Sequence, residues 1–124
     1  MADWLSVRQA KEFDRIHNHG TWAVASVGML GLVLGDTNYV NRALYGTKGD
    51  RSGGFLRQLD ELFSPDGWYM EGPYYVRYAL LPFFQFAEAV ERRRPAVRIY
   101  AYRDSILKKA LFAAVNSAFP NGVF

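Results

Sequence analysis

Two short stretches of this chain carry side chains that can bind anions and move protons. The first is His17-Asn18-His19, which places an amide between two imidazoles at an expected helix entrance. An amide and an imidazole can hydrogen-bond a carboxylate, an imidazole can accept a proton near neutral pH, and a helix N-terminus itself favours an anion. A plainer interpretation stays open, in which Asn18 caps the helix and the histidines are simply exposed.

The second stretch gathers phenols around one carboxylate and one guanidinium, namely Tyr69, Glu71, Tyr74, Tyr75, Arg77 and Tyr78. A phenol has an ordinary pKa of about 10, so it is a poor base unless a nearby cation stabilises the phenolate, but it can act as a general acid unaided. Helical spacing puts Tyr74 and Tyr78 on one face and turns Tyr75 elsewhere. Aromatic packing with the hydroxyls in water is the alternative for each tyrosine.

We interpret the two stretches as halves of one site. Glu71 follows a turn, so it either accepts hydrogen bonds from loop N–H groups, which we favour, or pairs with Arg77. No third ligand accompanies His17 and His19, and the chain has no cysteine. The sequence therefore predicts no metal in this site.

Charge and hydropathy limit the partners. The net charge is only +3, and the one basic run, residues 92–94, precedes Pro95 as the end of a helix would. Without a basic stripe and interleaved exposed aromatics, we expect no nucleic-acid partner. The most apolar run, residues 23–34, is too short to cross a bilayer, so no membrane partner is expected either.

Apolar residues recur at helical spacing along most of the chain. We expect helices over residues 3–16, from a cap at Thr21 to Gly35, over 38–44, from Gly54 to the turn before Ser64, over 74–93 and over 98–118. Pro82 lies inside one of them and should cause a kink or a break. Because strand alternation is nowhere sustained, the sequence predicts an all-α fold of stacked antiparallel helix hairpins, as part of a longer protein.

Several segments resemble the heparinase II/III-like polysaccharide lyases, and among these most closely the oligoalginate (exo-type alginate) lyases. In chain order the matching segments are Asn18-His19-Gly20-Thr21-Trp22, Arg42-Ala43-Leu44, Gly53-Gly54, Pro65-Asp66-Gly67-Trp68-Tyr69 and residues 71–79, Glu-Gly-Pro-Tyr-Tyr-Val-Arg-Tyr-Ala. They cover nearly the whole chain. The position after Tyr75 departs from the family pattern, because an amide-bearing residue is common there and this chain has Val76.

The resemblance implies a fold and a reaction. Residues 1–124 would be the C-terminal part of an (α/α) toroid whose parent also has antiparallel β-sheet domains outside this segment. Such enzymes cleave uronate-containing polysaccharides by β-elimination. Because the family takes further site residues from the sheet domain, we expect this segment alone to be inactive. No cofactor is expected in it, and a structural metal would belong to the missing sheet domains.

The resemblance also assigns roles to residues. Asn18 and His19 would lie against the uronate carboxylate, with His19 either neutralising it or serving as the base for one C5 epimer. Tyr75 would protonate the leaving O4, and it is also a candidate for the base of the other epimer. Tyr74 is the alternative acid. The remaining candidates for substrate binding are Trp22, Tyr69, Glu71, Tyr74, Arg77 and Tyr78.

The expected partners are an acidic oligosaccharide or polysaccharide and the rest of the parent chain. Oligoalginate is the favoured substrate. A heparin- or heparan-type glycosaminoglycan lyase and a non-catalytic helical carbohydrate-binding module remain as alternatives.

Overall fold

Helices make up most of the structure, a computed structural model that describes residues 12–118 and 120–123. Its α-helices are α2 (Asn18–Leu34), α3 (Thr37–Tyr45), α4 (Gly54–Glu61), α5 (Pro73–Arg93) and α6 (Tyr102–Asn116), with the 3-10 helices η1 (Pro95–Val97) and η2 (Ile99–Ala101) between the last two. The described residues contain no strand, only an isolated bridge between Phe63 and Tyr69. The all-α prediction is confirmed, and membership in a toroid stays a prediction.

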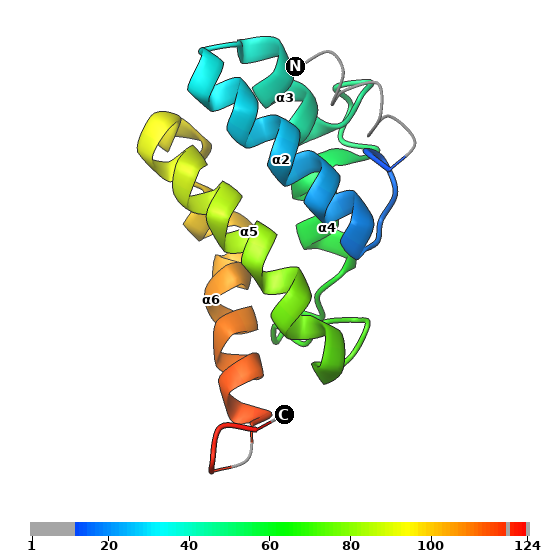
Figure 1. Cartoon of the computed structure of the whole chain (residues 1–124), viewed down its shortest axis with the longest axis vertical. Coiled ribbons are helices and arrows are strands. Elements are labelled where there is room, and N and C mark those ends of the chain that lie inside the picture. Colours follow the sequence, from blue (N-terminus) through cyan, green and yellow to red (C-terminus); the bar gives the residue numbers. More distant parts are fainter. Residues whose placement is uncertain (1–11, 119, 124) are drawn as a thin grey trace.

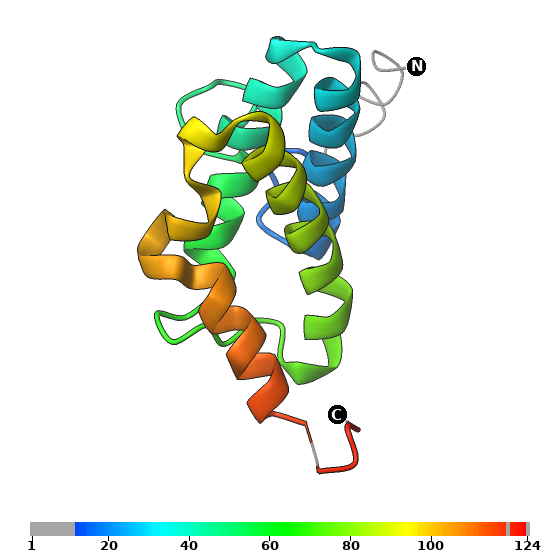
Figure 2. The same cartoon turned by 90° about the vertical axis from the view of Figure 1, so that its left-hand side faces the viewer.

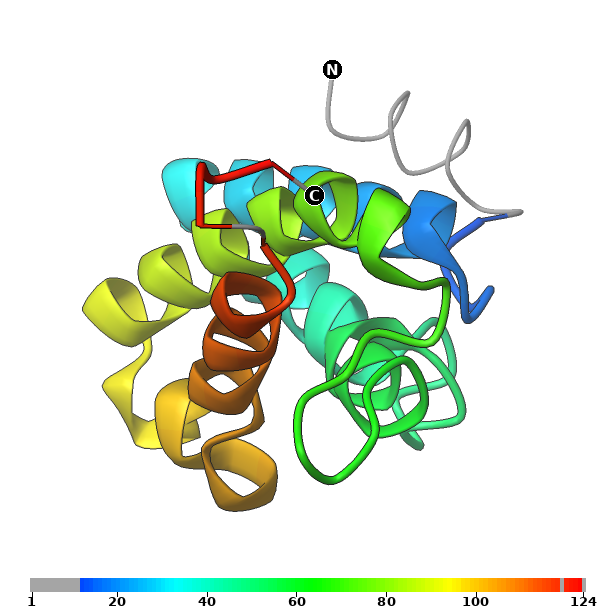
Figure 3. The same ribbon diagram turned by 90° about the horizontal axis from the view of Figure 1, so that it is seen from below.

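The helices form two layers. Helices α2 and α5 lie side by side in one layer (Figure 1), and α3, α4 and α6 lie in the other (Figures 2 and 3). Aromatic rings fill the space between the layers: the ring of Phe55 on α4 lies 4.9 Å from that of Phe86 and 5.3 Å from that of Phe83, both on α5. This contact holds α5 against α4. It thereby helps to position the two predicted site stretches, which lie at the start of α2 and at the start of α5.

The middle of the chain follows the sequence prediction. The short helix at 38–44 is α3, the helix from Gly54 is α4, and the polar segment between them is a connector without a helix. The Pro65-Asp66-Gly67 turn is present as well. Gly67 has a φ of +94°, and a Cβ there would lie 2.3 Å from the backbone carbon of Lys109, so both conformation and space call for glycine.

Three helix boundaries differ from the prediction. For the helix expected at 3–16, residues 3–11 lie outside the described residues, and residues 12–16 form a turn and coil. Helix α2 begins at Asn18 rather than after Thr21. Helix α6 begins at Tyr102 rather than near Arg98, and η1 and η2 precede it.

The start of α6 is irregular because it is tied to the end of α4. Arg103, Asp104 and Ser105 have left-handed φ values between +47° and +59°. The Arg103 guanidinium donates hydrogen bonds to the carbonyl oxygens of Leu59 at 2.6 Å and Phe63 at 2.8 Å. These bonds satisfy carbonyls at the C-terminal end of α4, so they stabilise a backbone conformation that is costly for residues with a Cβ.

Pro82 does not break α5, which runs from Pro73 to Arg93 as one helix. A proline removes one backbone hydrogen bond, here the bond to the carbonyl of Tyr78. Pro82 itself is buried, and Phe83 and Phe86 just after it have no exposed surface. Packing on this face therefore outweighs the lost hydrogen bond. Of the predicted kink or break, the structure rules out the break.

We expect Gly28→Ala to weaken the contact of α2 with α3 and α5. A Cβ at Gly28 would lie 2.3 Å from Cζ of Phe86 and 2.8 Å from Cβ of Ala43, so neighbours on both helices must move. The free energy of unfolding, measured by denaturant titration, should fall by about 1–3 kcal/mol. Leu34→Ala at the exposed end of the same helix is the control and should change it by less than about 0.5 kcal/mol. Equal effects at the two positions would contradict this account.

Candidate functional site at the start of α2

The first turn of α2 is closed by His17. Its Nδ1 accepts a hydrogen bond from the backbone N–H of His19 at 3.3 Å, so His17 is the N-cap and Asn18 is the first helical residue. An accepting Nδ1 carries no proton, which puts the proton of the neutral ring on Nε2. The N-cap is therefore neither Thr21, as predicted, nor Asn18, the alternative.

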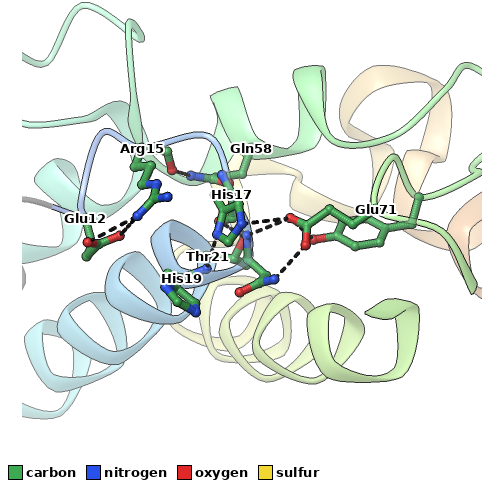
Figure 4. Close-up of polar contacts among 9 residues, drawn as sticks. Glu12, Arg15, His17, His19, Thr21, Gln58 and Glu71 are labelled. Carbon is green, nitrogen blue, oxygen red and sulfur yellow. Dashed lines mark hydrogen bonds and ion pairs between the residues drawn. The ribbon is translucent and has the colours of Figure 1, made fainter. Parts of the chain in front are cut away.

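Gln58 connects α4 to the segment that leads into α2. It is fully buried, its Oε1 accepts from the backbone N–H of His17 at 3.3 Å and from the Thr21 hydroxyl at 3.1 Å, and its Nε2 donates to the carbonyl oxygen of Arg15. Figure 4 shows Gln58 reaching from α4 into the bend between Arg15 and Thr21. One amide thus satisfies three buried or half-buried polar groups and sets the direction in which α2 begins.

Glu71 reaches the same helix start from the segment before α5 (Figure 4). Its Oε1 accepts from the backbone N–H of Asn18 at 3.1 Å, its Oε2 accepts from the Asn18 side-chain amide at 2.6 Å, and Oε1 lies 3.9 Å from Nε2 of His17. Tyr69 donates its hydroxyl hydrogen to Oε1 at 3.1 Å. Glu71 therefore has the structural role that we favoured, and in the described residues no ion pair joins it to Arg77.

Tyr69 lies behind the site. Only 2% of its surface is exposed. Burial and the adjacent charge of Glu71 raise the pKa of Tyr69 far above its ordinary value. The hydroxyl therefore stays protonated and donates to Glu71 throughout the physiological pH range.

An open pocket of about 520 Å³ lies between α2 and α5, and it brings together residues of both predicted stretches. Among the described residues, Glu12, Asn18, His19, Trp22, Tyr75 and Tyr78 line it. The imidazole of His19 and the phenols of Tyr75 and Tyr78 are exposed, whereas Asn18 is 9% exposed. The pocket thus presents an amide, an imidazole and two phenols to a ligand.

The pocket is lined by a different pair of tyrosines from the pair predicted to share a helix face, Tyr74 and Tyr78. Tyr75 and Tyr78, three residues apart, line it together, and Tyr74 does not. Tyr74 is 66% exposed, makes an edge contact with the ring of Tyr75, and lies under the Arg77 guanidinium, whose carbon is 5.2 Å from the ring centre. Tyr74 and Arg77 therefore flank the pocket, while Glu71 and Tyr69 lie behind Asn18 in its wall.

The sequence analysis missed two residues of this region, Glu12 and Gln58, and the role of a third, His17. Glu12 lines the pocket and pairs with Arg15 at 3.2 Å, and nothing in the local pattern pointed to it. The capping role of His17 was missed because histidine is not a usual N-cap residue. Gln58 did leave a signal, since it is an amide next to the apolar positions Phe55 and Leu59 of α4.

Comparison with known proteins decides the family. The family profile described as alginate lyase matches residues 1–122. The chain belongs to the alginate lyase family. Over all 124 residues it is 50% identical to an exo-oligoalginate lyase of Saccharophagus degradans and 53% identical to an alginate lyase of Stenotrophomonas maltophilia. The chain covers 17% and 16% of those two proteins, so it spans about one sixth of the length of these curated relatives.

The resemblance to oligoalginate lyases is thereby confirmed at the level of the family. Two further findings on this member of the alginate lyase family concern metal ions and membranes. Among the described residues, no three His, Asp or Glu side chains are grouped so that they could hold a metal ion. No helix in the same part of the chain is long and apolar enough to cross a membrane.

We expect Gln58→Leu to destabilise the start of α2. Leucine fills a similar volume but leaves the N–H of His17 and the carbonyl oxygen of Arg15 without a partner, which should lower the free energy of unfolding by about 1–3 kcal/mol. Chemical denaturation followed by circular dichroism measures this loss. Gln85→Leu, on the exposed side of α5, is the matched control and should change stability by less than about 0.5 kcal/mol. A Gln58 variant as stable as the Gln85 variant would contradict the role of Gln58.

Proposed function

We propose that this chain is part of the catalytic domain of a polysaccharide lyase that cleaves uronate-containing glycans, oligoalginate first, by β-elimination. The observation that carries the proposal is the meeting of Asn18, His19 and Tyr75 in one open pocket. Membership in the alginate lyase family and the printed names of the two relatives support it.

The first requirement of the reaction is to neutralise the uronate carboxylate. The C5 proton next to a carboxylate is only weakly acidic, and its removal builds up an enolate-like dianion. Preorganised donors at the carboxylate therefore supply the largest share of catalysis. Asn18 and His19 line the pocket side by side at the start of α2 and would supply these donors.

The second requirement is an acid and a base on the scissile unit. His19 would take the C5 proton of one epimer, and the Tyr75 phenolate could do so for the other. The C4=C5 double bond then forms, the C4–O4 bond breaks, and the Tyr75 hydroxyl gives a proton to the leaving O4. Where the Tyr75 phenolate is the base, that proton is the one it has taken from C5. Tyr75 lines the pocket and Tyr74 does not, which favours Tyr75 as the acid.

The charges around the pocket are compatible with an acidic ligand. Two carboxylates lie near it, and each has partners that reduce its effect. Glu12 pairs with Arg15, and Glu71 accepts hydrogen bonds from Asn18 and Tyr69. Among the described residues, the pocket lining adds no other carboxylate.

The test is the near-ultraviolet absorbance of newly formed unsaturated uronate, with the full-length gene product acting on alginate oligomers, heparan and chondroitin. Tyr75→Phe should lower the rate by about 10²–10⁴-fold, because the phenyl ring keeps the shape but has no proton to give. Tyr100→Phe, which removes a hydroxyl bound to Glu88 on the far end of α5, is the control and should keep the wild-type rate.

Each other outcome has a meaning. A loss in Tyr74→Phe rather than in Tyr75→Phe would move the acid by one residue. Activity on heparan alone would favour a glycosaminoglycan lyase. A folded wild-type protein that binds these glycans and produces no absorbance would replace the lyase by a carbohydrate-binding module.

A further inference from the structure

Glu71 contacts Asn18 twice, through the backbone and through the side chain. Its two oxygens accept from the Asn18 backbone N–H at 3.1 Å and from the Asn18 amide Nδ2 at 2.6 Å. A charged acceptor that binds one residue at two points restricts both its position and its rotation. The contact spans 53 residues of sequence and joins the two stretches that form the pocket.

The contact also fixes the orientation of the Asn18 side-chain amide, that is, the directions in which Nδ2 and Oδ1 point. A carboxylate only accepts hydrogen bonds, so Nδ2 of Asn18 must face Glu71 and Oδ1 must face away. One amide hydrogen is then committed to Glu71. The other amide N–H has no partner among the described hydrogen bonds, and Asn18 lines the pocket.

Glu71 also occupies the position that an anion would otherwise take at the N-terminus of α2. The first two N–H groups of the helix are bound, that of Asn18 by Glu71 and that of His19 by His17. A substrate carboxylate therefore meets side chains rather than the helix N-terminus. Binding of the substrate carboxylate at this helix start therefore depends on the orientation of the Asn18 amide.

We propose that Glu71 is a positioning residue, whose carboxylate holds the Asn18 amide in the orientation that binds the substrate carboxylate as its charge builds up. The inference rests on the proposed function. It replaces the expectation that Glu71 binds substrate, since Glu71 lies outside the pocket lining. Tyr69 supports Glu71 from behind through its buried hydroxyl.

Removing the charge of Glu71 shows whether Glu71 positions Asn18 or only lies near the substrate, because the two roles predict changes in different kinetic constants. If the carboxylate only sat near an anionic substrate, Glu71→Gln would relieve repulsion and lower KM. If it positions Asn18, the Gln amide presents its own donor, the Asn18 amide is no longer held, and kcat falls. We expect kcat about 10- to 100-fold lower, with a smaller change in KM.

Glu12→Gln is the matched charge control. Glu12 also lies at the pocket, but it pairs with Arg15 and makes no hydrogen bond to Asn18 among the described contacts. Its expected effect is a lower KM. A fall in kcat as large as that of Glu71→Gln would overturn the positioning role, because loss of charge alone would then explain both variants.

The decisive measurement is a double-mutant cycle in the full-length gene product on alginate oligomers. Asn18→Ala/Glu71→Gln should be no slower than Asn18→Ala alone, because Glu71 acts through Asn18. Losses that multiply would overturn the inference while leaving the lyase in place. A wild-type protein that cleaves no uronate glycan would overturn the proposed function, and this inference with it.

A second variant covers the case in which Glu71→Gln does not fold. Tyr69→Phe keeps the buried ring and removes one donor to Glu71. It should lower kcat by a few fold in the wild-type background and not at all in the Asn18→Ala background. The same fall in both backgrounds would overturn the inference.

Discussion

The structure depends on one carboxylate that bridges two distant segments. Glu71 lies just before α5, and its hydrogen bonds end on the first residue of α2, 53 positions earlier. The contacts of Phe55 with Phe83 and Phe86 hold the layers together, but these apolar rings give no hydrogen-bond partner to the polar groups at the start of α2. The relative placement of His19 and Tyr75 follows from the bridge, because each lies within a few residues of one of its ends.

A second constraint acts on the other side of the same helix start. Gln58 on α4 binds backbone groups of Arg15 and His17 and thereby fixes the bend that leads into α2. Two side chains, Gln58 from α4 and Glu71 from the turn before α5, thus help to determine where α2 begins. The backbone N–H groups of His17, Asn18 and His19 all have side-chain partners here, as a helix start requires.

The sequence predicted well what local spacing determines. The all-α class, the helix from Gly54 and the turn at Gly67 follow from apolar periodicity and turn chemistry, and the resemblance brought Asn18, His19 and Tyr75 forward as candidates, which the structure gathers in one pocket. What depends on distant partners was not predictable. His17 became the cap instead of Thr21 because Gln58 and Glu71 satisfy the neighbouring groups, and α5 passes through Pro82 because buried aromatic packing outweighs a lost hydrogen bond.

The occupied N-terminus of α2 has a consequence for the design of ligands for this pocket. The N-terminus of a helix normally binds compact anions, so a sulfate or phosphate group is an obvious ligand for such a site. Here the protein's own Glu71 fills that place, and a ligand that offers only negative charge would compete with a tethered carboxylate at high effective concentration. Selective compounds should instead present a planar acceptor to the Asn18 amide and an aromatic or sugar face to Trp22 and Tyr78.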